Sequence, residues 1–532
     1  MPVLTVKLKK GQRHINFVPG RPLRVILDET DLRVRAGCSG VGNCGLCRVK
    51  IENAEFYEPT PGEYLLLSKK QLVEGVRLAC QIIPKNNLKI KILNAAPKAE
   101  WRSLPFRQVK SCSARPLKGL SYDIEHYYAI AVDLGTTHIS LSLWDLDKGK
   151  IVTGRYGLNP QISYGLDVIT RLITAAKSPE HAKKLSRQSI EAIGQALLDI
   201  SIREGIDLQQ IVRVVLVGNT PMLALLSGKN YQLLLDPAYW MDYVDCLPQN
   251  SGDCVKKWRI HPRAVIETIS PLAGFIGSDL LSGILSTRFI EERCSGLFID
   301  FGTNSEIALW DGKILRVTSA AGGPAFEGCN ISCGMPAEPG AIYRIIIKRG
   351  VLDFDTIAGE EPLGICGSGL IDLIANLVKS GDLSNKGIFT AGVHKEGFVV
   401  SGCKSRIMLT KGDVDLFQRA KAAIGAGISV LLNKAGMEYK DLERIYIAGA
   451  FGRFLHVANA QMIGLLPDIP FDRIELCGNA ALMGCEDLLL SPTAGERLKK
   501  IRKLSEITNL SQSLDFNELF FKHLFLQSFE GE

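Results

Sequence analysis

The chain contains two related stretches, IAVDLGTTHISLSLWD at residues 130–145 and GLFIDFGTNSEIALWD at residues 296–311. In each, a continuous apolar strand leads into Asp, any residue, Gly and Thr, and then into an alternating strand that ends in Trp-Asp. Continuous apolar runs are typical of strands buried on both faces. The two aspartates, Asp133 and Asp300, lie 167 positions apart. The repeat therefore predicts a duplicated α/β domain with one phosphate loop in each half.

These repeats carry the predicted phosphate chemistry, because the sequence has no G-x-x-x-x-G-K-[ST] motif. A tight hairpin after a buried strand points backbone N–H groups at an anion, and a nearby Asp can orient Mg²⁺ or its waters. We therefore predict that Asp133 and Asp300 are catalytic residues. The predicted phosphate contacts follow them: Gly135, Thr136 and Thr137 in the first half, and Gly302, Thr303 and Asn304 in the second.

Two further glycine-rich stretches extend the predicted ATP site. A strand running into small residues lets a flat adenosine approach the backbone. The stretch IYIAGAFG, residues 445–452, is such a strand end, and Gly449, Ala450 and Gly452 are its predicted adenosine contacts. The stretch AGGPAFEG, residues 321–328, favours a loop that lines the cleft, with Gly322, Gly323 and Glu327 near the phosphates; a surface loop is the open alternative.

A cysteine motif lies near the N-terminus, where Cys38-SGVGN-Cys44-GL-Cys47 is followed 33 positions later by Cys80. Four thiolates are what a [2Fe–2S] cluster needs, two for each iron. Zinc ribbons prefer two C-x2-C pairs, and Cys80 has no such neighbour. We therefore predict that these four cysteines bind a [2Fe–2S] cluster, in a spacing that resembles the adrenodoxin-like branch of the ferredoxin fold.

Composition limits the remaining classes. The chain has 532 residues and a net charge of +7, which is small for this length and gives little support to a nucleic-acid role. No uncharged apolar stretch of about 18 residues exists, so no membrane span is predicted. The N-terminus lacks a signal-peptide pattern, which predicts a cytoplasmic protein. The other ten cysteines are expected to be small buried residues (Cys112, Cys246, Cys254, Cys294, Cys329, Cys333, Cys366, Cys403, Cys477 and Cys485).

The sequence patterns divide the chain into four regions. Residues 1–96 are predicted to form a β-grasp [2Fe–2S] ferredoxin-type domain, and residues 97–125 an irregular linker. Residues 126–290 are predicted to form a middle domain, the first ATPase lobe, and residues 291–532 the C-terminal ATPase lobe. The predicted fold class is thus multidomain α/β.

The order of the three nucleotide elements resembles that of the actin-like and sugar-kinase-like ATPases, in which two lobes close on ATP. Together with the cysteine motif, a set of stretches looks like one family, the reductive activators of corrinoid proteins. Besides those already quoted, they include NPQISYGLDVITR (159–171), GNTPM (218–222), AGFIGSDL (273–280), GICGSGLID (364–372), AKAAIGAGI (420–428) and GNAALMG (478–484). The resemblance covers nearly the whole chain.

This resemblance implies an ATP-dependent reductase that passes one electron from its [2Fe–2S] cluster to inactive Co(II) corrinoid on a partner methyl-carrier protein, restoring Co(I). The partner would be a corrinoid iron–sulfur protein or a methyltransferase corrinoid subunit, and an unidentified donor would reduce the cluster. The resemblance also implies a homodimer. Two other functions stay open: an ATP-dependent activator of a radical dehydratase, and a non-catalytic redox-sensing nucleotide-binding module.

Overall fold

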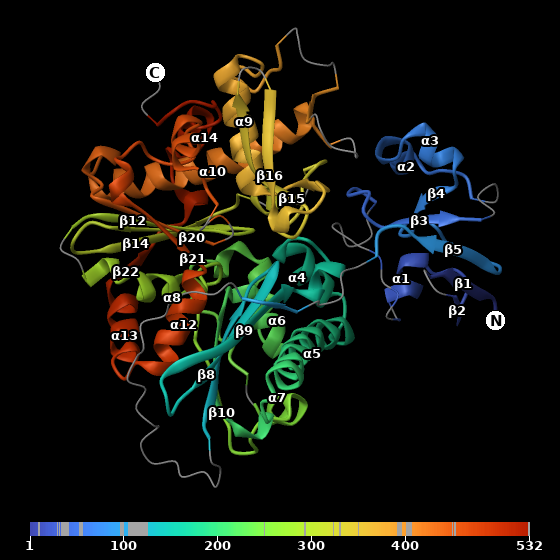
Figure 1. The fold of residues 1–532 in the computed structure, drawn as a ribbon, viewed down its shortest axis with the longest axis horizontal. Helices are drawn as coiled ribbons and strands as arrows, with labels where there is room; N and C mark the ends of the chain where they lie inside the picture. Colours follow the sequence, from blue (N-terminus) through green and yellow to red (C-terminus); the bar gives the residue numbers. More distant parts are fainter. Residues whose placement is uncertain are drawn as a thin grey trace.

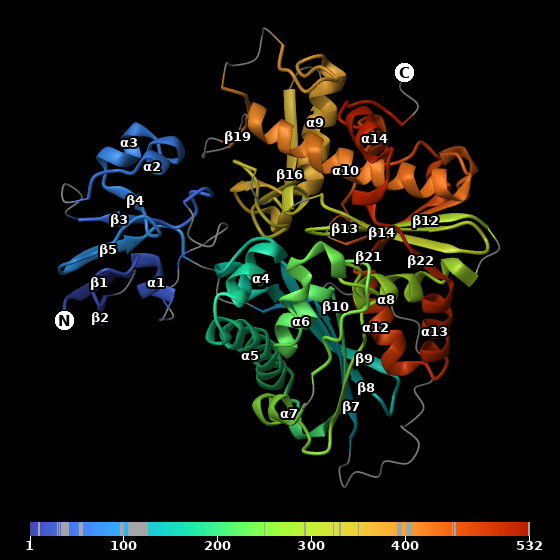
Figure 2. The same cartoon turned by 180° about the vertical axis from the view of Figure 1, so that it is seen from behind.

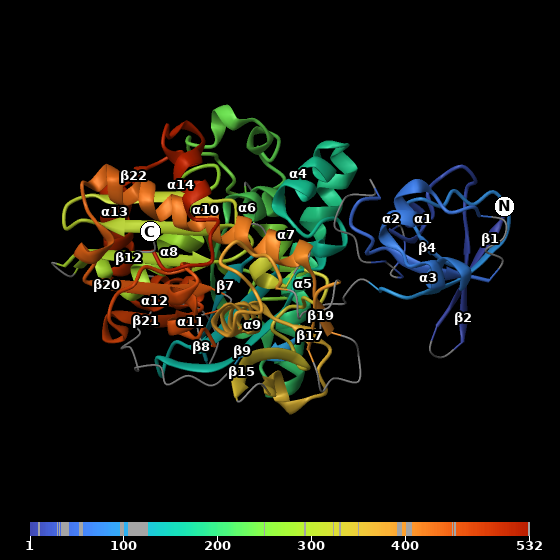
Figure 3. The same ribbon diagram turned by 90° about the horizontal axis from the view of Figure 1, so that it is seen from above.

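The computed structural model describes most of the chain (Figure 1). The described residues are 1–8, 11–28, 30, 32, 34, 42–52, 57–95, 101–104, 126–248, 251–291, 294–322, 324–328, 331–348, 351–390, 396–400, 407–449, 451 and 454–529. An N-terminal domain lies at one end of the molecule, and two α/β lobes form the larger body (Figures 1 and 3).

The N-terminal domain is a mixed sheet covered by short helices. Its strand order is β2 (Gln12–Asn16), β1 (Val3–Lys7), β5 (Leu88–Ile92), β3 (Arg48–Ile51) and β4 (Val76–Leu78). Its helices are α1 (Leu23–Asp28), α2 (Pro61–Leu66) and α3 (Lys69–Val73). Strands β1 and β5 are parallel, whereas the other pairs are antiparallel. Alternate residues of β1, Leu4 and Val6, are fully buried, as a strand with one face on a core requires.

Each predicted ATPase lobe is built on a sheet of the same design. In the first lobe the order is β11 (Val265–Thr268), β10 (Ile211–Gly218), β7 (Tyr128–Leu134), β8 (His138–Asp145), β9 (Lys150–Leu158) and β6 (Arg102–Ser103). In the second it is β21 (Ile474–Gly478), β20 (Arg444–Gly449), β12 (Gly296–Phe301), β13 (Ser305–Trp310), β14 (Leu315–Ala320) and β22 (Ser505–Ile507).

The strands that contain the repeat occupy equivalent places in the two sheets. Strand β7 pairs antiparallel with β8 and parallel with β10, and β12 pairs antiparallel with β13 and parallel with β20. Asp133 and Asp300 are therefore at equivalent positions, each one residue before the end of its strand, β7 or β12. The duplication predicted from the sequence is present in the fold.

Helices cover both sheets. Those of the first lobe are α4 (Val168–Ala176), α5 (Pro179–Glu204), α6 (Thr220–Ser227), α7 (Gly252–Trp258) and α8 (Ser278–Thr287). Those of the second are α9 (Gly367–Ser380), α10 (Lys411–Ala435), α11 (Val457–Met462), α12 (Ala480–Leu490), α13 (Ala494–Leu504) and α14 (Phe516–Lys522). The second lobe also holds two small sheets, β15 (Ala341–Lys348) with β16 (Val351–Thr356) and β17 (Gly364–Ile365), and β18 (Phe398–Val400) with β19 (Ile407–Leu409).

The two lobes share a hydrophobic core. Helix α12, which follows β21 of the second-lobe sheet in sequence, packs against α8 and against strands β7 and β10 of the first lobe. Figure 2 shows α8, α12 and α13 gathered on one side of the second-lobe sheet. Cys485 of α12 is fully buried there, with its thiol 3.2 Å from the carbonyl oxygen of Val215 in β10. Because α12 packs against elements of both lobes, it connects their hydrophobic cores.

The predicted linker contributes to the first lobe. Its residues Arg102 and Ser103 form β6, which pairs antiparallel with β9, and Trp101 is buried in the first-lobe core. Most of the rest of that segment, residues 97–100 and 105–125, lies outside the described residues. The four domain limits themselves stay a prediction. In the part of the chain that is described, no helix is both long enough and apolar enough to span a membrane.

The close crossing of α8 and α12 predicts a sensitive position at Gly484. A Cβ on this glycine would lie 1.8 Å from the backbone oxygen of Ser282, so one of the helices would have to shift. We expect Gly484→Ala to destabilise the protein by about 1–3 kcal/mol, measured by denaturant unfolding. Gly495→Ala in α13 is the matched control, because no atom lies within 4 Å of its added Cβ. Equal stability of the two variants would contradict this packing.

Candidate functional site

A cavity of about 360 Å³ lies between the two lobes. Both predicted phosphate loops line it, the first through Asp133, Gly135, Thr136 and Thr137, and the second through Asp300, Gly302, Thr303 and Asn304. Glu327 and Gly449 line it as well. The structure thus brings together in one cavity most of the residues that the sequence singles out for nucleotide binding.

The first phosphate loop is a tight turn that buried polar groups hold in place. A Cβ on Gly135 would lie 2.7 Å from the carbonyl oxygen of His138, so the turn requires glycine there. The side chain of Asn219, which also caps α6, donates to Thr136 Oγ1 over 2.9 Å. Thr136 and Thr137 are both nearly fully buried. The loop is therefore preorganised, as a phosphate site requires.

The second phosphate loop has the equivalent turn. The backbone N–H of Gly302 donates to the carbonyl oxygen of Asn304 over 3.1 Å. Thr303, at the tip of this turn, is buried and directs its hydroxyl toward the first loop. The two loops approach so closely that the hydroxyl oxygens of Thr137 and Thr303 are 3.3 Å apart.

Glu327 bridges the two phosphate loops. One of its carboxylate oxygens, Oε2, accepts hydrogen bonds from Thr137 Oγ1 over 2.6 Å and from Thr303 Oγ1 over 2.5 Å. Burial raises the pKa of this carboxyl, although the two hydroxyl donors act in the opposite direction. The carboxylate thus occupies the point where hydroxyl groups from both loops converge, and hydroxyl groups are also donors for phosphate oxygens.

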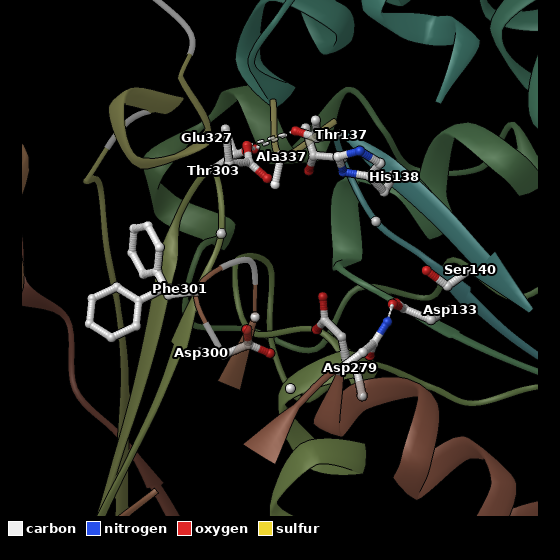
Figure 4. Close-up of a pocket in the computed structure, with 18 of the residues that line it drawn as sticks. Asp133, Thr137, His138, Ser140, Asp279, Asp300, Phe301, Thr303, Glu327 and Ala337 are labelled. Carbon is white, nitrogen blue, oxygen red and sulfur yellow. Dashed lines mark hydrogen bonds between the residues drawn. The ribbon is translucent and has the colours of Figure 1, made fainter. Parts of the chain in front are cut away.

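Several more carboxyl groups line the cavity. Asp133, Asp279, Asp300 and Glu306 are all among its lining residues. Figure 4 shows Asp133, Asp279 and Asp300 on the side of the cavity opposite the Glu327–Thr137–Thr303 group. The side-chain amide of Asn479, at the start of α12, donates to Asp133 Oδ2 over 2.8 Å and so orients that carboxylate.

Burial and mutual repulsion change the titration of these carboxyl groups. Burial raises the pKa of Asp133 to about 7 and that of Asp279 to about 6. Burial and then the neighbouring carboxylates, Asp279 first, raise the pKa of Asp300 to about 8. The same causes raise the pKa of Glu306 well above its usual range. Like charges gathered in a buried place favour protonation or a bound cation.

The predicted adenosine loop forms one wall of the cavity. Gly449 has a φ of +87°, and a Cβ there would lie 2.2 Å from the carbonyl oxygen of Phe301. The nearby wall includes Phe451, Phe454 and Met483, whose apolar groups suit a flat base. Of the other predicted contacts, Ala450, Gly452 and Gly323 lie outside the described residues.

Gly322, which the sequence predicts near the phosphates, packs outside the lining of the cavity. It is buried, and an added Cβ would meet Ser305 Oγ at 3.5 Å and Ile424 at 3.6 Å. It is not among the lining residues of the cavity, and it packs between β13 and α10. A small residue is needed there for packing. The glycine-rich pattern indicated that the backbone approaches another segment closely, but it did not identify that segment.

Sequence reasoning did not single out several lining residues. Asp279 lies at the start of α8 and Glu306 in β13. Asp279 is within AGFIGSDL, where an Asp just before an apolar helix reads as an ordinary first-turn residue. Glu306 pairs with Asp300 across the second hairpin as Ser140 pairs with Asp133 across the first. Ser140 lines the cavity too, so the polar residue opposite each aspartate could have been predicted as a lining residue.

The predicted cluster ligands gather in the N-terminal domain. The sulfur atoms of Cys47 and Cys80 are 3.4 Å apart and both residues are buried. Cys44 is half-buried three residues before Cys47, whereas Cys38 lies outside the described residues. Gly42, with a φ of +93°, lies so close to Gln81 that a Cβ would approach its amide nitrogen to 2.5 Å. Closely spaced thiols under a glycine-rich loop fit a [2Fe–2S] cluster.

The remaining cysteines are consistent with packing roles where they are described. Cys246, Cys366 and Cys485 are buried, and Cys254, Cys294, Cys333 and Cys477 are half-buried. Cys112, Cys329 and Cys403 lie outside the described residues. Within the described part of the chain, no group of three or more His, Cys, Asp or Glu residues has the geometry of a bound metal ion.

The raised carboxyl pKa values predict that stability falls as pH rises when no cation is present. In the folded protein Asp133, Asp279 and Asp300 keep their protons up to about pH 6–8, whereas in the unfolded chain they lose them near pH 4. The folded state therefore binds more protons in this window, and its stability declines as pH increases through it. Asp300→Asn removes one of these titrations, so its melting temperature should depend less on pH. Parallel melting profiles for both proteins in chelator, from pH 4.5 to 8.5, would contradict this.

Three family descriptions match consecutive parts of the chain. Residues 6–85 match a "2Fe-2S iron-sulfur cluster binding domain", residues 128–292 the "RACo middle region", and residues 295–531 the "C-terminal domain of RACo the ASKHA domain". The order of these matches is the order predicted from the sequence patterns.

Two relatives and one solved structure agree with these matches. The chain is 32% identical over 414 residues to the corrinoid activation enzyme RamQ of Eubacterium limosum, which covers 74% of this chain and 69% of that protein. It is 28% identical over 411 residues to a [Co(II) methylated amine-specific corrinoid protein] reductase of Methanosarcina barkeri, covering 71% and 72%. A solved structure titled "Reductive activator for corrinoid,iron-sulfur protein" superposes with a TM-score of 0.68 at 26% identity, covering 99% of this chain and 98% of that one.

These findings confirm the predicted fold class, the [2Fe–2S] ferredoxin domain and the ATP-binding lobes. The chain belongs to the family of reductive activators of corrinoid proteins.

Proposed function

We propose that this protein is an ATP-dependent reductase that transfers one electron to the Co(II) corrinoid of a partner methyl-carrier protein and so restores Co(I). The observation that carries the proposal is the presence, in one chain, of a paired-cysteine site in a ferredoxin domain and of two phosphate loops that face each other across one cavity. The names of the relatives support a corrinoid protein as the partner.

An energetic argument explains why the two sites belong together. The bound cluster supplies single electrons, at a potential near −400 mV for plant-type clusters. For a one-electron step, each 59 mV of uphill potential costs about tenfold in the equilibrium constant. In this account the reduction potential of the Co(II)/Co(I) couple is lower than that of the cluster, so the electron transfer is uphill. Closure of the lobes on ATP would then change the cobalt environment on the partner or trap the product.

We propose that the carboxyl groups of the cavity hold Mg²⁺ with the ATP phosphates. Asp133, Asp279 and Asp300 provide oxygen ligands, directly or through water, of the kind that Mg²⁺ prefers. A divalent cation would also relieve the repulsion that raises their pKa values. The two phosphate loops would donate to the phosphate oxygens from opposite sides.

Entry of the phosphates would replace the Glu327 bridge. A phosphate between the loops needs the same hydroxyl donors, Thr137 and Thr303, that Glu327 now uses. Two anionic groups repel each other at this spacing, so Glu327 has to withdraw or share a cation with the phosphate. In this account the bridge holds the loops in register until ATP arrives.

The remaining partners are also part of the proposal. A separate donor resupplies the electron, because the sequence carries no flavin or nicotinamide fingerprint. We propose a homodimer, as the family resemblance implies, and a cytoplasmic location.

The proposal predicts that Asp133 is needed for corrinoid reduction. Reduced holoprotein, MgATP and a Co(II) corrinoid protein are mixed, and Co(I) is followed optically. Asp133→Asn should slow Co(I) formation by about 10- to 100-fold, because an oriented carboxylate near Mg²⁺ is lost. Asp147→Asn, an exposed residue after β8, is the control and should reduce cobalt at the wild-type rate. A full rate with Asp133→Asn would refute the proposed role of the cleft.

The cluster assignment has its own test. Reconstituted protein should contain two irons for each chain, and Cys80→Ser should lose most of them, because each iron of a [2Fe–2S] cluster needs two thiolates. Cys246→Ser, a buried cysteine of the first lobe, is the matched control and should keep both irons. More than two irons for each wild-type chain would point instead to the dehydratase-activator alternative.

A further inference from the structure

Residues 158–166 lie between the nucleotide cavity and the N-terminal domain. They run from the last residue of β9 through a 3₁₀ helix, η2 (Pro160–Ser163), to the turn before α4. We call them the docking segment. Figures 1 and 3 show the N-terminal domain next to the part of the first lobe that carries α4.

Asn159 of the docking segment holds the first phosphate loop. Its backbone N–H donates to the carbonyl oxygen of Thr137 over 2.8 Å, and its side-chain amide donates to that of Gly135 over 2.9 Å. Asn159 is fully buried, so these hydrogen bonds do not compete with water.

Arg171 of α4 adds a second connection between the same two segments. Its guanidinium donates to the carbonyl oxygen of Thr136 over 2.7 Å and to that of Gly165 in the docking segment over 2.8 Å. Arg171 is fully buried as well. Three successive carbonyl groups of the phosphate loop are thus bonded either to the docking segment or to an arginine that also binds it. A shift of the loop therefore has to move the docking segment or break buried hydrogen bonds, which is costly.

The other face of the docking segment carries the cluster-binding loop. Leu158, Ile162 and Leu166 form a small buried cluster, and Leu46 of the N-terminal domain packs against it. Leu46 is the residue directly before Cys47 in the Cys44-Gly-Leu-Cys47 motif. The apolar contact between the domains is therefore made by the loop that carries two of the cluster ligands.

A hydrogen bond fixes the same interface. Arg24 of α1 is 6% exposed, and its Nη2 donates to the carbonyl oxygen of Ser163 over 3.3 Å. Ser163 is itself nearly fully buried. A buried guanidinium bonded to a carbonyl of the other domain specifies one docked orientation.

From this chain of contacts we propose that the docking segment is an intramolecular binding site for the cluster-binding loop, and that ATP in the cleft weakens this docking. The inference rests on the proposed function. Phosphates that replace the Glu327–Thr137 hydrogen bond shift the first phosphate loop, and Asn159 and Arg171 pass the shift to the surface under Leu46.

The direction of the effect follows from what docking covers. The loop around a cluster offers a short path for an electron to leave it, and here Leu46 of that loop is half-buried against the first lobe. Docking thus keeps the loop from the partner protein in the nucleotide-free state. When ATP weakens the docking, the cluster-binding loop becomes accessible to the partner protein at the stage when ATP drives the electron transfer.

Thermodynamic linkage between docking and ATP binding allows the proposal to be tested by measuring nucleotide affinity. If ATP weakens docking, docking must weaken ATP binding by the same factor. Arg24→Ala removes a docking contact, and Arg24 is not among the residues that line the nucleotide cavity. We expect it to tighten binding of a non-hydrolysable ATP analogue with Mg²⁺ by about fivefold or more, measured by calorimetry on the full-length holoprotein. Arg13→Ala, on exposed strand β2 of the same domain, is the matched control and should bind as the wild type does.

Amide hydrogen exchange of the same samples provides the second readout. In the wild type, saturating analogue should speed exchange in residues 42–49 about fivefold or more. In Arg24→Ala exchange there should already be fast without nucleotide. Asn159→Ala should bind the analogue but lose the nucleotide-dependent difference. Gln209→Ala, at an exposed residue of the first lobe outside both the docking segment and the cavity lining, is the control and should keep it.

The outcomes separate the inference from the proposed function. If the analogue binds but neither affinity nor exchange changes as described, the docking inference is wrong and the proposed function stands. Weaker binding by Arg24→Ala than by wild type would likewise overturn the inference. If the wild-type holoprotein binds no adenine nucleotide at all, the proposed function fails first.

Discussion

The burial of five carboxyl groups around one cavity is the constraint on which the rest of the structure depends. Asp133, Asp279, Asp300, Glu306 and Glu327 come from both lobes, and each has a raised pKa because charge is costly away from water. Such a group is most stable when it binds protons or a cation. The shared core of α8 and α12 supplies the packing that holds these repelling groups together.

The same arrangement explains how the lobes can change their contacts when nucleotide binds. Without nucleotide, Glu327 joins the loops through Thr137 and Thr303. With MgATP, cation and phosphates would satisfy the same groups in another geometry, so the two states differ in the contacts they make. An electron donor fused to such a cleft can use that difference, because uphill reduction needs a coupled change of state and not only a low-potential cluster.

The sequence predicted the parts of this design that repeat or follow strict spacing. The duplicated Asp-x-Gly-Thr hairpin placed Asp133 and Asp300 at equivalent positions, because a buried strand and a tight turn leave few alternatives. Cys47 and Cys80, which the thiol spacing predicts as cluster ligands, lie with their sulfur atoms 3.4 Å apart. Asp279 was missed, since a first-turn Asp is common in helices. Gly322 is not among the residues that line the cavity, since glycine marks a close approach but does not identify the neighbour. The docking segment depends on pairings between residues distant in sequence, such as Arg24 with Ser163, which no local pattern encodes.

The central claim is that ATP drives the electron uphill, and an equilibrium measurement tests it most directly. Holoprotein and Co(II) corrinoid protein are poised at a fixed potential near that of the cluster, and the final ratio of Co(I) to Co(II) is recorded with and without MgATP. The account predicts that the ratio without ATP follows the potential gap, about tenfold for each 59 mV, and that MgATP raises it well above that value. The same ratio under both conditions would contradict the account.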